Sequence, residues 1–200
     1  LPVLIAAVEA IADPVFNLYA IQATTHPCAP LMIINGPIRE ALGMNYSSGS
    51  FGPGWRANAT IGRAMRLVLL NVGGAYPGVG DMSTQGAPSK FSYCVAENEE
   101  ENPWEPLHVE RGFRPDQSAV TVMAGEPPHN INDHSGRSAD DILTIVAGAI
   151  SVTGANNAYT GGETLLALGP EHAATISGDG LSKKDVVEWL HQRAKIPLER

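Results

Sequence analysis

The chain has 200 residues, of which 44% are hydrophobic, and its 21 acidic residues outnumber 13 basic ones to give a net charge of −8. This is the length of one domain, which can bury enough apolar surface to fold without a disulfide or a metal. The acidic balance and the lack of an apolar run of about 18 residues argue against a protein that binds nucleic acid or a membrane, because phosphate contacts need a basic face and a span needs such a run.

Helical and strand patterns alternate along the first half of the chain. An apolar helical pattern over 2–12 ends before Asp13-Pro14, and the runs 16–23 and 31–34 predict strands. The glycine- and serine-rich segment 43–54 predicts a loop. Residues 55–71 predict the clearest helix, because its apolar residues repeat at helical spacing on one face.

The second half continues the alternation. After a long loop at 75–90, the pattern predicts strands at 91–96, 118–123 and 164–168 and a short helix at 102–110. Ser138 and Ser182 are each followed three residues later by an aspartate, which is the capping pattern of a helix start. Gly169-Pro170 is predicted to begin a further helix. The interleaving predicts the α/β class, with a mixed sheet in a single domain over 1–200.

The cysteines and the amino-terminal residues indicate the cellular location of the protein and whether the chain is a fragment. Cys28 and Cys94 are too few for the disulfide framework of a secreted domain, and no signal peptide is visible, so we expect a cytoplasmic protein. The chain opens on an apolar run, Leu1 to Val8, without an initiating methionine or a helix cap. This start predicts a fragment of a longer protein, a processed chain, or the product of a gene truncated at its 5′ end.

A glycine-rich loop leads directly into the helix predicted at 55–71. Unpaired backbone N–H groups at a helix start favour anions, and Arg56, Asn58 and Arg63 follow that loop. With Asn35, at the end of the strand predicted at 31–34, these residues are predicted to hold an anionic substrate. No Gly-Lys-Ser/Thr follows, so this is not a nucleotide-binding P-loop. A flexible loop before a core helix, with solvated arginines, is the alternative.

Acidic residues follow the strand predicted at 91–96. Glu97 lies at its carboxyl end, where ligands bind in open α/β sheets, and His108 is near enough in sequence to join it. We predict that Glu97 and His108 act as acid and base. The run Glu99 to Glu101 is predicted to be a solvated acidic turn instead.

Two further histidines lie beside turns. His26 and Cys28 follow the strand predicted at 16–23 and could bind a divalent metal, with His26 as the metal ligand, although two such residues do not make a zinc site. His172 lies in the first turn of the helix that opens at Gly169, where the helix dipole favours its neutral form and a role as a base. The alternatives are a structural loop and simple helix capping.

Several stretches together resemble a known family: Asn35-Gly36-Pro37, Ala57 to Ala64, Ala96 to Glu100, Pro103 to His108 and Gly169 to Ala173. They resemble the larger C-terminal region of the bacterial UGSC-like proteins, over nearly all 200 residues. That family carries a selenocysteine- or cysteine-Gly-Ser-Cys motif in an N-terminal domain. The motif is absent here, so the resemblance implies no redox residue. It implies that this chain is the body of a longer protein.

Three functions are compatible with these patterns. The first is an enzyme of lyase or hydrolase type acting on a small anionic molecule, in which Glu97, His108 and His172 are catalytic and a divalent metal could assist. The second is one half of a thiol-dependent oxidoreductase, working with a missing thiol or selenol domain. The third is a non-catalytic binding or scaffold domain of a homo-oligomer. A small-molecule substrate and a homo-oligomer are the expected partners.

Overall fold

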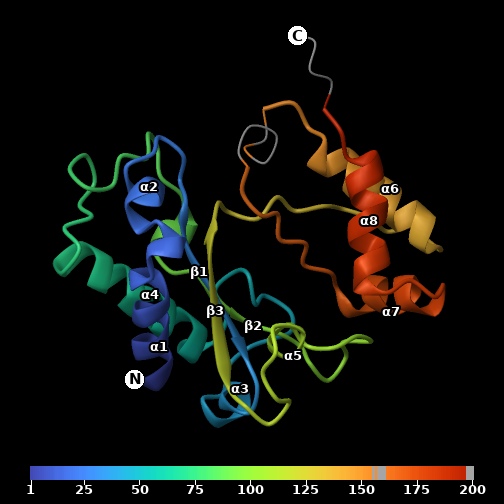
Figure 1. Ribbon diagram of the computed structural model, residues 1–200, viewed down its shortest axis with the longest axis horizontal. Coiled ribbons are helices and arrows are strands. Elements are labelled where there is room, and N and C mark those ends of the chain that lie inside the picture. Colours follow the sequence, from blue (N-terminus) through green and yellow to red (C-terminus); the bar gives the residue numbers. More distant parts are fainter. Residues whose placement is uncertain (155, 157–160, 197–200) are drawn as a thin grey trace. The chain divides into compact units, whose positions relative to one another are not determined.

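A computed structural model describes residues 1–154, 156 and 161–196. The chain divides into two compact units: unit 1 comprises Leu1–Glu100 and Pro106–Pro128, and unit 2 comprises Glu101–Glu105 and His129–Arg200 (Figure 1). The helices and a mixed sheet confirm the predicted α/β class. Because two compact units can belong to one domain, the single domain over 1–200 stays a prediction.

The sheet of unit 1 has three strands in the order β2-β1-β3. The central strand β1 (Ala29–Asn35) runs parallel to β2 (Cys94–Ala96) and antiparallel to β3 (Ala119–Gly125). All seven residues of β1 are buried, as expected of a central strand that is covered on both faces. Because β1 and β2 are parallel, their carboxyl ends meet at one edge of the sheet.

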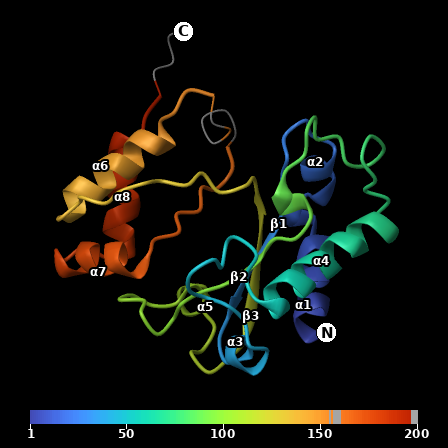
Figure 2. The same cartoon turned by 180° about the vertical axis from the view of Figure 1, so that it is seen from behind.

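Two helices cover one face of this sheet, α1 (Pro2–Ala12) and α4 (Arg56–Asn71), as Figure 2 shows. Helix α1 buries Val3, Ala7 and Ile11, whose spacing of four residues puts them on one side of a helix. Alternate strand residues complete this core, Met32 and Ile34 among them. The intervening residues of β1 and β2, with Tyr93 just before β2, form a second cluster on the other face: Ala29, Leu31, Ile33, Tyr93 and Val95.

Four of the predicted elements were wrong in type or extent. Residues 16–23 form no strand: Asp13 caps a 3-10 turn at Pro14–Phe16, and Asn17, in the left-handed region, begins α2 (Leu18–Gln22). The strand predicted at 91–96 is shortened to β2, because the 3-10 turn Pro88–Lys90 precedes it. The helix predicted at 102–110 begins only at α5 (Leu107–Glu110), after the extended Pro106. Residues 164–168 form no strand.

In the described part of unit 2, the α-helices are α6 (Ala139–Ile150), α7 (Pro170–Gly178) and α8 (Lys183–Arg193). Both predicted serine caps are confirmed, since the hydroxyls of Ser138 and Ser182 accept the N–H groups of Asp141 and Asp185, each at 3.2 Å. Apolar residues of the three helices pack into one cluster: Ile142, Leu143, Val146, Ile176 and Val186.

Among the described residues, no single helix is long and apolar enough to cross a membrane. One bent pair, Pro2–Ala12 with Pro14–Gln22, passes on combined length and composition, with an angle of 71° between the two segments. The first segment of this pair is α1, which buries its apolar side in the core of unit 1.

A buried ion network anchors the long loop that precedes β2. The carboxylate of Asp81 accepts hydrogen bonds from Arg66 Nη2 and Lys90 Nζ, both at 2.8 Å, and from the Ser83 hydroxyl at 2.7 Å. Burial by itself would raise the pKa of Asp81, but the hydrogen bonds from Lys90 and Ser83 outweigh it and hold the pKa below its usual value. One carboxylate thus fixes the loop to α4.

Replacing this carboxylate should destabilise the protein in a pH-dependent way. We expect Asp81→Asn to lower the free energy of unfolding at pH 7 by about 3–5 kcal/mol, because two buried cations lose their counter-charge. A carboxylate whose pKa is lower in the folded state stabilises above the unfolded pKa, so the difference from wild type should narrow below about pH 4. Urea unfolding at pH 7 and pH 3.5 measures the difference in the free energy of unfolding between wild type and Asp81→Asn. The exposed Asp116→Asn is the control, and equal effects of both substitutions would contradict the prediction.

Candidate functional site

Polar residues gather where β1 ends, beginning with Asn35. Its side-chain amide is fully buried and donates to the carboxylates of Glu97, at 2.6 Å, and Glu99, at 2.9 Å. The N–H of Gly36 donates to the same Glu99 oxygen at 2.7 Å. Gly36 has a φ of +79°, a conformation that side-chain-bearing residues rarely adopt, so glycine is needed where the chain turns toward Glu99.

Arg39 holds the three carboxyl residues of this edge together. It lies on the short helix α3 (Ile38–Ala41), and its guanidinium contacts the Glu97 carbonyl at 2.7 Å, Glu99 at 3.1 Å and Glu100 at 2.9 and 3.1 Å. The hydrogen bonds from Arg39 lower the pKa of Glu100. Burial by itself would lower the pKa of Arg39, but Glu100 and Glu99 raise it, so the guanidinium stays charged.

His108 completes the group from α5. Its side chain is 0% exposed, and its Nδ1 lies 3.8 Å from Glu99 Oε1, beyond hydrogen-bond length. In the part of the chain that the structure describes, neither ring nitrogen has a hydrogen-bond partner, and Asn35 Oδ1 has none either. Glu97 Oε2 accepts the N–H of Leu107 at 2.8 Å and so fixes the start of the helix that carries His108. We call this set of six residues the carboxylate–histidine cluster: Asn35, Arg39, Glu97, Glu99, Glu100 and His108.

The charge and burial of the cluster define the chemistry open to it. With the three carboxylates ionised and His108 neutral, the formal sum is one positive and three negative charges, or −2. An imidazole can donate or accept a proton near neutral pH. The exposed fraction of the side chains in the cluster ranges from 0% for His108 to 47% for Glu100. The cluster thus extends from a buried imidazole to a carboxylate at the surface.

The predicted metal ligand lies elsewhere in unit 1. His26 Nδ1 pairs with Glu126 Oε1 at 3.1 Å, and half of the His26 side chain is exposed. In the part of the chain that the structure describes, no three His, Cys, Asp or Glu side chains form a group that could hold a metal ion. In the cluster, the carboxylates of Glu97 and Glu99 instead accept N–H groups.

The predicted substrate-binding residues of α4 do not join Asn35 in the cluster. Arg56 is exposed at the helix start, and Arg63 stacks on the Phe91 ring with 4.1 Å between the guanidinium carbon and the ring centroid. Asn58 is buried and fixes the preceding loop, since its amide exchanges hydrogen bonds of 2.8 and 2.9 Å with the backbone of Asn45. The loop then presents the ring of Tyr46 to Arg39 at 4.9 Å. Asn58 therefore supports the cluster through the loop.

His172 belongs to unit 2, at the first turn of α7. Its Nε2 lies 3.6 Å from Asp133 Oδ2, which is buried and accepts no hydrogen bond. The other carboxylate oxygen of Asp133 accepts the N–H groups of Ser135 and Gly136, both at 2.9 Å, and these bonds lower the pKa of Asp133. His172 thus has a carboxylate neighbour of its own within unit 2.

Both thiols lie in surroundings that favour the protonated form. Burial raises the pKa of Cys94 to about 12. The pKa of Cys28 is also raised, first by burial and then by the charge of Glu126, against the opposing effect of Lys90. Thiolate chemistry at neutral pH is therefore suppressed at both positions.

This leads to a prediction for thiol labelling. At pH 7.5, Cys94 should react with a disulfide reagent only when the protein unfolds, and Cys28 should react several-fold more slowly than a free thiol. Mass spectrometry of the native protein and of urea-unfolded protein measures both rates. Fast labelling of native Cys94 would contradict the burial described here.

Sequence reasoning missed Arg39 and the inward half of the acidic run. The run Glu99 to Glu101 was predicted to be a solvated turn. This is wrong for Glu99, which is only 13% exposed, whereas Glu100 is 47% exposed; both residues pair with Arg39. The available signal was an arginine two residues after the Gly36-Pro37 pair that follows the strand. Comparisons with protein-family models, with curated proteins and with solved structures returned no match. The resemblance to the UGSC-like family therefore stays a prediction.

Proposed function

We propose that this chain is an enzyme of lyase or hydrolase type that acts on a small molecule, with His108 as the group that transfers the proton. One observation carries the proposal: His108 is fully buried, neither of its ring nitrogens has a hydrogen-bond partner among the described residues, and a carboxylate lies 3.8 Å away. A structural core histidine normally has its nitrogens satisfied, since each unsatisfied polar group costs about 1–3 kcal/mol. Such a cost is typical of a functional site.

The other cluster residues act as positioning residues in this proposal. Glu99 stabilises the imidazolium that forms when His108 takes a proton. Asn35 and Arg39 hold Glu99 in place, and Glu97 holds the start of α5 through the N–H of Leu107. The predicted role of Glu97 as an acid or base thus becomes one of orientation, because its carboxylate is engaged by Asn35 and Leu107.

The charge of the cluster bears on the substrate. The predicted anionic substrate depends on Arg56 and Arg63, which lie on α4 outside the cluster. A formal charge of −2 beside His108 would repel an anion and stabilise positive charge. We therefore propose a neutral or cationic reacting group, such as an amine-bearing molecule or an amide, in place of an anion.

Assays with a matched histidine pair test the proposal. A panel of small esters, amides and β-substituted amines is incubated with wild type, with His108→Gln and with His191→Gln, where His191 is exposed on α8. We expect turnover of a panel compound to fall at least a hundredfold in His108→Gln, as for loss of a general base, and to be unchanged in His191→Gln. Wild-type turnover by His108→Gln, or no turnover of any compound by wild type, would contradict the proposal.

The two other candidate functions have less support. A thiol-dependent oxidoreductase needs a thiolate, and the pKa values of both cysteines are raised. A scaffold in a homo-oligomer gives no reason for a buried histidine with two unsatisfied nitrogens. For location we propose the cytoplasm, since Cys28 and Cys94 are free thiols, as is usual in a reducing compartment.

A further inference from the structure

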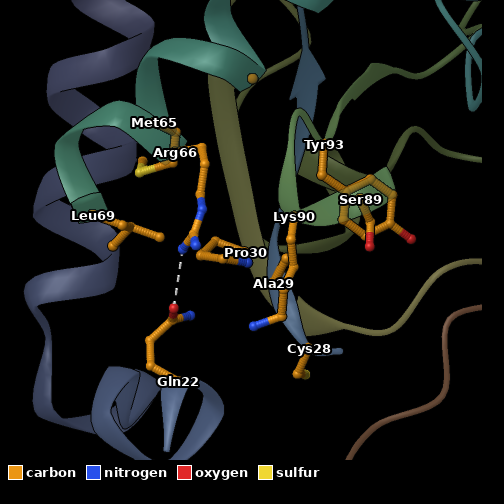
Figure 3. A pocket seen from close by; sticks show the side chains of 11 residues that line it. Gln22, Cys28, Ala29, Pro30, Met65, Arg66, Leu69, Ser89, Lys90 and Tyr93 are labelled. Carbon is orange, nitrogen blue, oxygen red and sulfur yellow. Dashed lines mark hydrogen bonds between the residues drawn. The ribbon is translucent and has the colours of Figure 1, made fainter. Parts of the chain in front are cut away.

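A small cavity lies at the amino end of β1, between that strand and α4 (Figure 3). Its volume of about 10 Å³ accommodates a single water-sized occupant. Six of its lining residues carry the argument: Gln22, Cys28, Ala29, Arg66, Ser89 and Lys90. Since β1 has seven residues, the cavity is roughly 20 Å along the strand from Asn35, so it is separate from the carboxylate–histidine cluster.

The charges beside this cavity do not balance. Arg66 and Lys90 are both only 8% exposed and share one carboxylate, that of Asp81. For these three residues, two positive charges and one negative charge leave a formal sum of +1. Glu126, whose charge also acts on Cys28, pairs with His26 Nδ1 at 3.1 Å. An uncompensated buried charge is costly, and a bound anion would remove that cost.

Several hydrogen-bond donors at this cavity are not fully used. Gln22 is 6% exposed; its Oε1 accepts from Arg66 at 3.2 Å, whereas its Nε2 has no hydrogen-bond partner among the residues that the structure describes. Lys90 has three N–H donors and gives one to Asp81 at 2.8 Å. Figure 3 shows the amide of Gln22 and the ammonium of Lys90 reaching toward the same space below Arg66. The hydroxyl of Ser89, also without a partner, lines the same cavity.

We propose that this cavity binds one monatomic anion of the halide class, held by Lys90 and Gln22 Nε2. A water molecule would satisfy the donors but would leave the charge of +1 in place. Phosphate, sulfate and organic carboxylates are larger than a single water-sized occupant. A halide satisfies the donors and the charge together, and its effect is to stabilise unit 1 where β1, α4 and the loop before β2 meet.

The test compares sodium chloride with sodium gluconate at constant ionic strength and pH, and measures amide hydrogen exchange in β1. We expect exchange of the β1 amides in wild type to slow about tenfold by 100 mM chloride, saturating as for a single site. Gln22→Glu supplies a fixed negative charge at the same position and should lose the chloride response. The charge-matched control Gln192→Glu lies on the exposed face of α8 and should keep it.

Two direct measurements do not depend on the folding of the variants. Crystals of wild type grown in sodium bromide should show an anomalous peak beside Lys90. Alkylation of Cys28 by neutral iodoacetamide should slow by about twofold or more in chloride, because the anion would offset the effect of Lys90 on the thiol. Equal β1 exchange in chloride and gluconate, a wild-type chloride response in Gln22→Glu, or no bromide peak at Lys90 would each overturn the proposal.

Discussion

His108→Leu should stabilise the protein while it removes the proposed activity. The imidazole is fully buried and neither of its nitrogens has a hydrogen-bond partner. Leucine has a similar volume and no polar group to desolvate, so we expect the free energy of unfolding to rise by about 1–3 kcal/mol. Urea unfolding followed by circular dichroism gives this value, and the assay described above gives the loss of turnover. Gain of stability with loss of activity is the usual mark of a functional residue.

A matched pair of substitutions separates this effect from simple packing. His108→Gln keeps a polar group in the same enclosed position and should give no gain in stability. His191→Leu, on the exposed side of α8, should change the free energy of unfolding by less than about 0.5 kcal/mol. If His108→Leu instead destabilised the protein by 2 kcal/mol or more, His108 would be a structural residue, and the proposed function would lose the observation on which it rests.

Arg39→Met should have the largest destabilising effect of any substitution in the cluster. The Arg39 side chain is 5% exposed, and its guanidinium is in contact with Glu99 and Glu100. Removing it leaves several negative charges together in a partly buried site, so we expect a loss of about 3–5 kcal/mol in the free energy of unfolding at pH 7. Denaturant unfolding measures the loss, and the exposed Arg114→Met, whose partner is Asp116, should cost less than about 1 kcal/mol.

The pH dependence of the Arg39→Met effect gives a second check. Arg39 lowers the pKa of Glu100, so this carboxylate stabilises the folded state above its unfolded pKa, and that contribution is lost as the pH falls. The difference between wild type and Arg39→Met should therefore narrow below about pH 4. The double substitution Arg39→Met with Glu99→Gln should recover part of the stability. A pH-independent difference with no recovery would contradict the ion-pair explanation.

The sequence correctly predicted those helices and strands that are specified by a pattern of nearby residues. The helix of 55–71, the serine caps at Ser138 and Ser182, and the buried strand at 31–34 each depend on periodicity or on a capping residue within a few positions. The strands predicted at 16–23 and 164–168 failed because a short apolar run does not distinguish a strand from a short helix or an extended segment. Asp13 and Asn17, whose side chains cap the two short helices, decided the first of these cases.

The candidate site shows the same division. Asn35, Glu97 and His108 were predicted because each lies just after a predicted strand or close to one in sequence, and strand ends commonly carry function. Arg39, Glu99 and Glu100 were not predicted as site residues. A charged residue in a turn gives the same local sequence pattern whether its side chain is solvated or ion-paired. Only the parallel pairing of β1 with β2 brings Arg39 to residues about 60 positions away in sequence.

By itself, then, the sequence determined the α/β class, most helix boundaries and the strand ends at which polar residues gather, because these follow from local patterns. The tertiary structure decided which polar residues share a site. It separated Arg56 and Arg63 from Asn35, and it turned part of an acidic run inward onto Arg39. It also left His108 enclosed with both nitrogens unsatisfied. Burial and long-range pairing set these properties, and neither is encoded in the spacing of residues along the chain.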